Sequence, residues 1–234
     1  MKKSIFLIQA IGLALLFACS SGNQNYVPGK DKGPYGVKSG MVIYKPMNMM
    51  GVSISQTIYF DGYGNKETRE VTTQGNMMGQ TVQTHAFDIR EGLSSIHYEL
   101  ENIKNGQNVA TKEAYKQEIP KELLEQQYFS SLSDELKAKM KYKEEGTESI
   151  AGLTGTKYTM VPDSSNPGMV ATGVHYKNIL LKLVMGGIEI MAEKVDLDTK
   201  VPADKFIVPS GFKIIDKKTG LDKPITEGEN DTKK

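Results

Sequence analysis

The chain has 234 residues, with 29 Lys and Arg against 28 Asp and Glu, a single Cys and no Trp. A charge balance this close to zero provides no basic field of the kind that holds nucleic acid or anionic lipid. One thiol excludes an intramolecular disulfide framework and a zinc site built on several cysteines. The fold must therefore be stabilised by a hydrophobic core.

The N-terminus is typical of a secretory signal over residues 1–18, because Lys2 and Lys3 precede an apolar stretch without charge. That stretch is shorter than the ~20 residues that span a bilayer. The run Leu16-Phe17-Ala18-Cys19 resembles the bacterial lipobox, in which the cysteine is lipidated on sulfur before the signal is cut. The resemblance implies lipid attachment at Cys19. The alternative is an ordinary signal peptide that ends in a buried apolar cysteine.

A lipidated Cys19 would attach the protein to a membrane, since two or more acyl chains hold stably where one holds reversibly. Ser20 follows the cysteine where some lipoproteins have Asp, and residues 20–25 contain no acidic residue. By resemblance to known sorting schemes, these features favour the outer membrane with the protein facing the periplasm. Loss of Lys2 and Lys3 on cleavage changes the formal charge from +1 to about −1.

Composition divides the mature chain into three parts. Residues 19–40 are rich in Gly, Ser, Asn, Lys and Pro and are predicted to be a flexible tether. Residues 41–215 are predicted to form a single domain, and residues 216–234 are polar and charged enough to be a disordered tail.

Short alternating runs bounded by turn residues dominate residues 41–215, which is typical of an antiparallel sheet. The predicted strands, in chain order, cover residues 41–44, 52–60, 66–72, 84–90, 94–103, 155–161, 169–176, 180–185 and 188–195. The Asn105-Gly106 and Gly186-Gly187 pairs are strong hairpin signals.

One segment departs from this alternation. In Pro120 to Tyr142, Leu124, Tyr128 and Leu132 begin an apolar stripe at four-residue spacing, which predicts a helical segment. Ser133 has the character of an N-cap that divides the segment into two helices. The expected fold is mainly β (α+β): a curved antiparallel sheet or open half-barrel with this helical segment packed against its concave face.

Four runs resemble a family of uncharacterised envelope lipoproteins. They are Ile58 to Glu67, Gly146 to Gly152, His175 to Lys182 and Val201 to Phe212, in order over roughly residues 39–215. That family is thought to share the half-barrel of the Lol lipoprotein-localisation carriers (LolA and LolB type). The resemblance implies an apolar cavity between sheet and helix that accepts acyl chains.

The sequence contains no Gly-x-Ser-x-Gly elbow, no phosphate loop, no His-Glu-x-x-His pair and no dinucleotide fingerprint. His85, His97 and His175 lie on separate predicted strands, without a second histidine at metal-ligand spacing. We therefore expect no enzyme activity, no cofactor and no metal site built on these histidines.

Methionine is the unusual residue, with two clusters beside predicted turns: Met47, Met49 and Met50, then Met77 and Met78. Flexible methionines line adaptable apolar surfaces, whereas paired thioethers in an oxidising envelope can also select Cu(I). We expect these five residues, with Leu124, Tyr128 and Leu132, to line a binding site for a lipid or acylated peptide. The alternative is an interaction lipoprotein that docks other envelope proteins.

Overall fold

A computed structural model describes residues 33–49, 51–77, 79–121, 124, 132–162, 166 and 168–217. Cys19, Met50, Met78 and Tyr128 lie outside the described residues, as do the predicted signal peptide and most of the predicted tether and tail. The described part contains a 13-stranded sheet and little helix, and the α-helix that it describes throughout is α3.

The strands are β1 (Gly40–Met49), β2 (Val52–Asp61), β3 (Lys66–Met77), β4 (Gln80–Glu91), β5 (Ser94–Lys104), β6 (Gln107–Asn108), β7 (Glu113–Glu118), β8 (Lys143–Ile150), β9 (Leu153–Met160), β10 (Ala171–Tyr176), β11 (Ile179–Met185), β12 (Ile188–Leu197) and β13 (Lys213–Asp216). The helix α3 covers Asp134–Lys139, and 3₁₀ turns cover Gly62–Gly64 and Ala203–Phe206.

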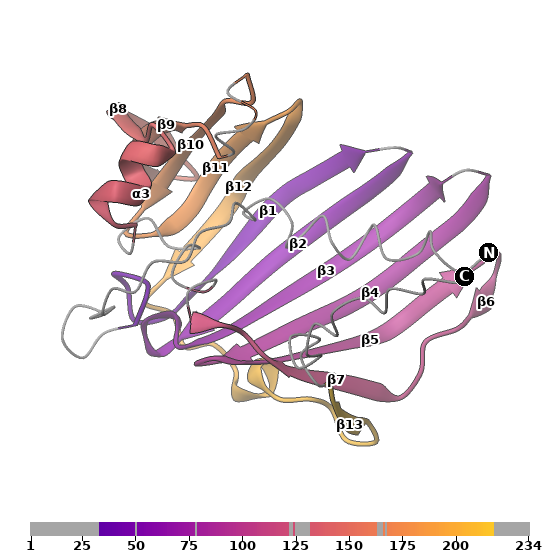
Figure 1. The fold of residues 1–234 in the computed structure, drawn as a ribbon. Coiled ribbons are helices and arrows are strands. Elements are labelled where there is room, and N and C mark those ends of the chain that lie inside the picture. The colour runs from indigo at the N-terminus through magenta and orange to yellow at the C-terminus, as the bar shows by residue number, and fades with distance from the viewer. Residues whose placement is uncertain are drawn as a thin grey trace, which may run out of the picture.

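The strand order is β13-β7-β5-β4-β3-β2-β1-β12-β11-β10-β9-β8, with β6 beside β5. All neighbours are antiparallel except β13 and β7. Figure 1 shows a continuous, curved sheet that stays open between its two edge strands. The predicted mainly β architecture with an open antiparallel sheet is therefore confirmed.

Both predicted glycine hairpins are present. Asn105 and Gly106 have φ of 50° and 79°, and Gly186 and Gly187 have φ of 57° and 82°. Two successive residues with positive φ match the right-handed twist of the flanking strands. Local turn chemistry thus sets the β5–β6 and β11–β12 connections.

The prediction of a helical segment packed against the concave face of the sheet is not supported by the described residues. Between 120 and 142 the helix described throughout is α3, which is six residues long and has no buried side chain. Ser133 caps it, as expected, by accepting a hydrogen bond from the Leu136 amide at 3.1 Å. The cap begins a new helix at Asp134, and this helix ends at Lys139, too soon to bury a stripe against the sheet.

The fold begins earlier than the predicted boundary at residue 41. Tyr35 and Val37 are buried in the main core cluster, and the Tyr35 and Phe60 rings meet edge to face with centroids 4.8 Å apart. The Tyr35 amide also donates a hydrogen bond to the Tyr63 carbonyl at 2.8 Å. Residues 35–40 therefore belong to the domain and not to a flexible tether.

Strand register assigns the side chains of β1–β5 and β7 to two faces, because directly paired residues project to the same side of a sheet. One row pairs Gly40, Phe60, Glu67, Arg90 and Ser95, and we call this side the Phe60 face. The adjacent row runs through Met41, Tyr59, Thr68, Ile89 and Ile96, and we call this side the Tyr59 face.

Candidate functional site

Charge is distributed unevenly along the sheet. Residues 46–60 and 71–87 contain no Asp, Glu, Lys or Arg, in a chain that is 24% charged. These two stretches lie side by side, because β2 pairs with β3 from Val52–Gly75 to Asp61–Lys66. We call them the neutral half of the sheet.

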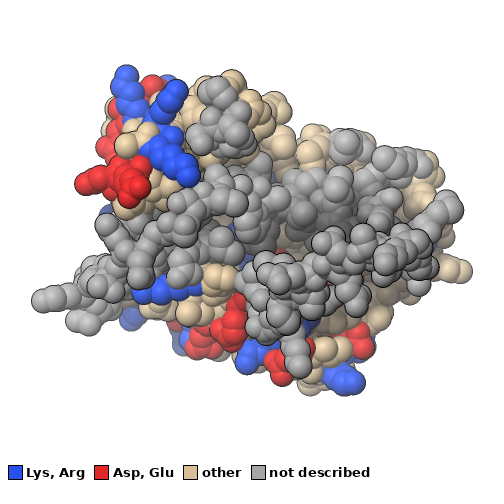
Figure 2. All heavy atoms as spheres, viewed as in Figure 1, with Lys and Arg blue, Asp and Glu red and all other residues tan. Residues whose placement is uncertain are grey.

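Charged side chains gather elsewhere on the view in Figure 2. Blue and red spheres cover the region of β8 and α3 and the lower edge of the molecule, while the upper right, where the β1–β4 hairpins end, is tan or undescribed. The neutral half itself is defined by its sequence and by the pairing of β2 with β3.

On the Phe60 face, the end of the neutral half nearest the hairpin turns is apolar, and the polar residues Gln56, Thr73 and Thr84 lie further along the strands. Register places Met47 opposite Ile54 and Met49 opposite Val52, and Val52 is opposite Gly75, which is opposite Val82. Val52 and Val82 are buried, and the two methionines and Ile54 are half-buried. A row of apolar side chains thus crosses β1, β2 and β4 at the end of the sheet.

The described members of the two methionine clusters come close together along the backbone. The Asn76 amide donates a hydrogen bond to the Gly51 carbonyl at 3.0 Å, which joins the β1–β2 turn to the end of β3. Met49 and Met77 therefore belong to strand ends that lie at the same end of the sheet. Ligand binding by these methionines stays a prediction.

Leu124 and Leu132 both pack inward, although they do not lie on one described helix. Leu124 packs, partly buried, against the core cluster that contains Phe60, and Leu132 is 7% exposed. Leu124 has a helical backbone and contacts the same apolar core as the Phe60 face, whereas Leu132 precedes α3 and is not helical. The predicted stripe is therefore not presented by one continuous helix.

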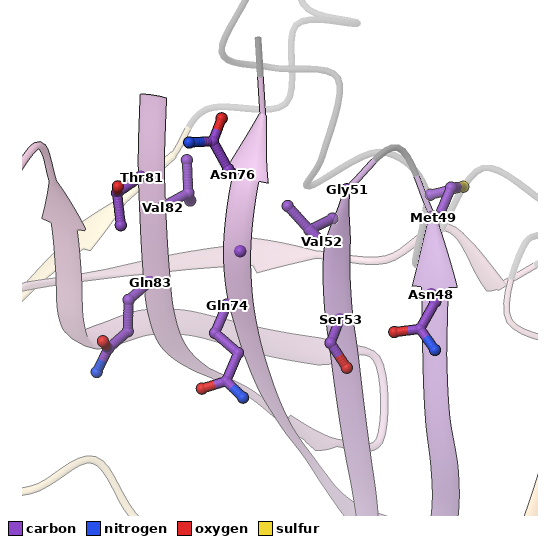
Figure 3. A pocket seen from close by; sticks show the side chains of 11 residues that line it. Asn48, Met49, Gly51, Val52, Ser53, Gln74, Asn76, Thr81, Val82 and Gln83 are labelled. Atoms are coloured by element: carbon purple, nitrogen blue, oxygen red, sulfur yellow. The ribbon is translucent and has the colours of Figure 1, made fainter. Parts of the chain in front are cut away.

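A shallow, open depression of about 860 Å³ lies at the β1–β4 end of the sheet (Figure 3). It is lined by three successive cross-strand rows. The rows are Asn48, Ser53, Gln74 and Gln83; Met49, Val52, Gly75 and Val82; and Gly51, Asn76 and Thr81. By alternation, the first and third rows project from the Tyr59 face and the middle row from the Phe60 face.

Gly75 is required by the close approach of the two hairpins at this depression. A Cβ at Gly75 would lie 2.3 Å from the Gly51 carbonyl oxygen, which is too close for any side chain. The absence of a side chain at residue 75 lets the β1–β2 turn pack directly against β3.

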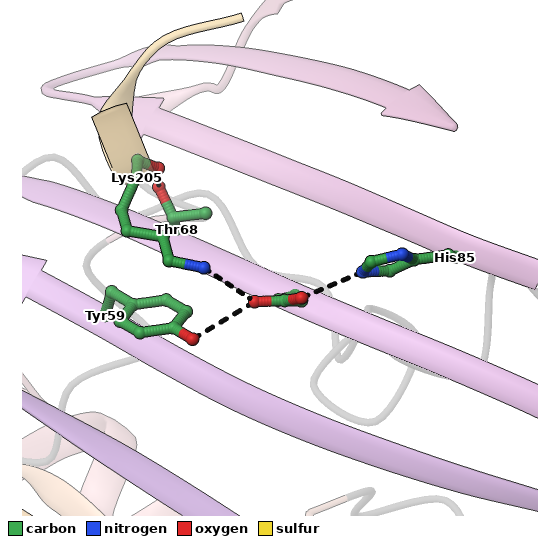
Figure 4. A network of polar contacts seen from close by, with 5 residues as sticks. Tyr59, Thr68, His85 and Lys205 are labelled. Atoms are coloured by element: carbon green, nitrogen blue, oxygen red, sulfur yellow. Dashed lines mark hydrogen bonds and ion pairs between the residues drawn. The ribbon is translucent and has the colours of Figure 1, made fainter. Parts of the chain in front are cut away.

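A carboxylate network marks the border of the neutral half on the Tyr59 face (Figure 4). The Glu70 carboxylate accepts hydrogen bonds from Tyr59 Oη at 3.1 Å and from Lys205 Nζ at 3.3 Å, and His85 Nε2 lies 2.8 Å from it. The Thr68 hydroxyl donates to the Lys205 carbonyl at 2.6 Å.

These contacts lower the pKa of Glu70. Partial burial acts to raise the pKa, but the hydrogen bond from His85 and the Lys205 ammonium outweigh it. The ammonium of Lys205 also lies over the Tyr59 ring, 4.5 Å from its centroid. These contacts fasten the segment around Lys205 to the sheet.

A second network fixes the start of the domain to the Phe60 face. Tyr35 Oη donates to Glu67 Oε2 at 2.6 Å, and Arg90 Nη2 lies 3.2 Å from the same oxygen. Burial acts to raise the pKa of Glu67, but the charges of Arg90 and Arg69 and the Tyr35 hydrogen bond outweigh it and lower the pKa. Glu67 is therefore a buried, paired carboxylate with a structural role.

The three histidines are on separate strands, as predicted: His85 on β4, His97 on β5 and His175 on β10. Burial lowers the pKa of His97, but its 2.8 Å contact with Asp88 outweighs this effect and raises the pKa. Burial lowers the pKa of His175, whose Nε2 lies 3.2 Å from Tyr142 Oη. Among the described residues, no three His, Cys, Asp or Glu side chains converge as a metal site would require.

Sequence reasoning missed the polar rows of the depression, because isolated Asn, Gln, Ser and Thr residues on strands have no motif. The sequence feature that could have indicated them is a lack of charge: residues 46–60 and 71–87, stretches of 15 and 17 residues, contain no Asp, Glu, Lys or Arg. Their significance appears only once the register brings the two stretches together.

No family model matches the chain, and no curated protein matches it in sequence. Its similarity to solved structures comes at low identity. An uncharacterised conserved protein of Thermus thermophilus is 8% identical, with a TM-score of 0.47 over 78% of this chain and 92% of that one.

MucB is 10% identical, with a TM-score of 0.38 over 76% of this chain and 59% of that one. A β-barrel-like protein of a domain of unknown function from Brucella abortus is 10% identical, with a TM-score of 0.39 over 70% of this chain and 100% of that one. Within the described residues, no helix has the length and apolar character needed to cross a bilayer. The function of this chain must therefore be argued from its own residues.

Proposed function

We propose that this protein is a lipid-anchored component of the bacterial envelope that binds an apolar ligand, a lipid or an acylated peptide, without catalysing a reaction. The lipobox-like run that ends at Cys19 supports the anchor. The resemblance of the strand and turn runs to Lol-type half-barrel lipoproteins supports the ligand class. Ser20 and the neutral residues after it support an outer-membrane position facing the periplasm.

The observation that carries the proposal is the apolar row on the Phe60 face of the neutral half. Met47, Met49, Val52, Ile54 and Val82 come together there from three strands, next to a depression of about 860 Å³. Flexible thioethers beside branched side chains suit acyl chains of varied length. No Asp, Glu, Lys or Arg occurs in either stretch of the neutral half, so an acyl chain beside the apolar row meets no desolvated charge from these two stretches.

The anchor is tested by growing cells with an alkyne-bearing palmitate and detecting label on the full-length protein. We expect label on the wild type and none on Cys19→Ala. Label that persists on Cys19→Ala would remove Cys19 as the attachment site.

The ligand is tested by native mass spectrometry of the full-length protein released from membranes. We expect a mass adduct of a lipid or acylated peptide. Met49→Gln should lower its occupancy by about five-fold, since it removes apolar contact area.

Met41→Gln is the matched control, because Met41 is a half-buried methionine of the same strand on the Tyr59 face. Its adduct should equal that of the wild type. Equal losses in both variants, or no adduct on the wild type, would contradict the proposal.

A docking role is the second candidate, and exposed apolar residues at one edge of the sheet favour it. Ile214 on edge strand β13 is 54% exposed, and Ile207 in the segment before it is 60% exposed. Crosslinking in intact cells that traps one stoichiometric protein partner, and loses it in Ile214→Lys, would favour this role over ligand binding.

A further inference from the structure

The Tyr59 face of the neutral half differs chemically from its Phe60 face. Its rows consist of neutral side chains that donate and accept hydrogen bonds: Asn48, Ser53, Ser55, Thr72, Gln74, Asn76, Thr81 and Gln83. Most of them are exposed, and Ser53 and Ser55 are half-buried. These side chains are therefore polar, mostly solvent-accessible and uncharged, and the Glu101 carboxylate of β5 borders them at Gln83.

The central row is arranged as a ladder across four strands. Asn48 pairs with Ser53, Ser53 with Gln74 and Gln74 with Gln83. Figure 3 shows these four side chains side by side along the depression. Neighbouring strands are about 4.8 Å apart, so hydrogen-bonding groups repeat at about that interval.

Each amide in this ladder offers both a donor and an acceptor, and each hydroxyl can act as either. Gln83 is held in place, because its Nε2 donates to Glu101 Oε2 at 2.7 Å. That contact leaves the Gln83 carbonyl oxygen as an acceptor at the edge of the ladder. A ligand here meets alternating donors and acceptors on a rigid sheet.

The absence of charge narrows the ligand class. Without Lys or Arg in these two stretches, the ladder provides no counter-charge for phosphate, carboxylate or nucleic acid. Neither stretch contains Asp or Glu, and among the described residues no three His, Cys, Asp or Glu side chains converge as a site for a hard metal cation would require. An apolar ligand would leave the amides without partners, which costs free energy for every buried polar group.

We infer that the Tyr59 face of the neutral half binds a neutral saccharide. Vicinal hydroxyls of a sugar donate and accept in alternation, which matches the Asn48, Gln74 and Gln83 amides and the Ser53 hydroxyl. This site lies on the opposite face of the sheet from the apolar row. The saccharide inference therefore goes beyond the proposed function, and its test is independent of the test for the apolar ligand.

The test is calorimetric titration of the full-length protein in nanodiscs with three neutral probes: the tetramers of glucose, mannose and N-acetylglucosamine. The tetramer of galacturonic acid serves as the charged comparison. We expect saturable binding of at least one neutral tetramer and none of the acidic one. The affinity should be the same at low and high salt, because no ion pair forms.

The double variant Asn48→Ala with Gln74→Ala should weaken binding at least ten-fold. Both side chains are exposed, so their removal leaves the fold intact, which the melting temperature checks. Gln117→Ala is the matched control, an exposed amide on β7 outside the ladder, and should bind as the wild type does.

Four results would overturn the inference. The first is no saturable binding of any neutral tetramer, and the second is equal affinity in the wild type and the double variant. The third is an affinity that falls steeply with salt. Capture of an extended peptide by the ladder in place of every sugar would likewise replace the saccharide with a protein partner.

Discussion

At the scale of single residues, buried charges are neutralised by specific partners and not by solvent. Glu67 is 9% exposed and Arg90 is 7% exposed, and Tyr35 closes the pair with a 2.6 Å hydrogen bond. A buried ion pair is weak evidence for stability in itself, but loss of one partner leaves the other charge buried. The network therefore governs how the domain responds to substitution and to pH.

Replacement of Glu67 by Ala should lower the free energy of unfolding by about 3–5 kcal/mol, because Arg90 is left buried without its counter-charge. Tyr35→Phe removes a hydrogen bond to a charged acceptor and should cost about 1.5–3 kcal/mol. Urea unfolding followed by circular dichroism measures both. An unchanged midpoint for Glu67→Ala would show that Arg90 is solvated.

Acid should weaken the same network. The pKa of Glu67 is lower in the folded state than its unfolded value of about 4.3. Its contribution is therefore complete above that value and is lost as pH falls through the folded pKa. The stability gap between the wild type and Glu67→Gln should be largest near neutral pH and shrink in acid, as followed by thermal melts. A gap that widens with acid would contradict this assignment.

At the scale of elements, the segment 201–212 crosses the Tyr59 face and is attached at both ends. Lys205 bonds Glu70, while Phe212 meets the Tyr98 ring edge to face at 5.1 Å. Val208 and Phe212 pack against the cluster of Phe87, Ile89, Tyr98 and Ala114. This segment completes a second core that is separate from the one around Phe60.

Phe212→Ala should therefore lower the free energy of unfolding by about 2–4 kcal/mol, because it removes ring contacts at a half-buried site. Amide hydrogen exchange in the Phe212→Ala variant should become faster first in residues 203–216. This range includes β13, because β13 begins directly after Phe212. Lys205→Met keeps most of the side-chain length but removes the ammonium, so it should quicken exchange around 203–206 with a smaller effect at β13. Uniform exchange changes across the sheet would show that the segment is not a separate unit.

The hairpin packing at the end of the sheet depends on Gly75. Gly75→Ala places a Cβ 2.3 Å from the Gly51 carbonyl and should cost about 1–3 kcal/mol. Gly79→Ala, a turn glycine with open space around it, is the comparison that reports backbone strain without a collision. A larger loss for Gly79→Ala would refute the close-approach explanation.

Sequence patterns predicted strands well where both alternation and turn residues were present. The stretches around β2, β4, β5, β11 and β12 have alternating apolar residues and glycine turns, and all are strands. Edge strand β8 was missed because its face is polar, as Lys143, Glu144 and Glu145 are exposed. Charged residues on an edge strand prevent its pairing with other chains. They also replace the alternation of apolar and polar residues from which a strand is predicted.

The helix prediction failed for a different reason. Four-residue spacing from Leu124 to Met140 satisfies the helical period, and the predicted cap at Ser133 is present. The helix that follows the cap is only six residues long and buries no side chain, so it is too short to carry the stripe. Met47 and Met49 were singled out from the sequence, but the two proposed faces could not be predicted, since they exist only where the two uncharged stretches pair.

At the scale of the whole molecule, the neutral half is a sheet region with two chemically different faces, one apolar and one rich in amides and hydroxyls. The proposed anchor at Cys19 would keep both faces near a membrane. A protein held in this way can receive or present a ligand at the membrane, but it cannot carry the ligand far.

The most direct test of ligand binding is photo-crosslinking of the purified full-length protein in nanodiscs with an added fatty acid that carries a diazirine. We expect modification of Met47, Met49, Val52 or Val82 on the Phe60 face, suppressed by unlabelled fatty acid. Modification of Asn48, Ser53 or Gln74 on the Tyr59 face, or labelling that unlabelled fatty acid does not suppress, would contradict an apolar ligand on the Phe60 face.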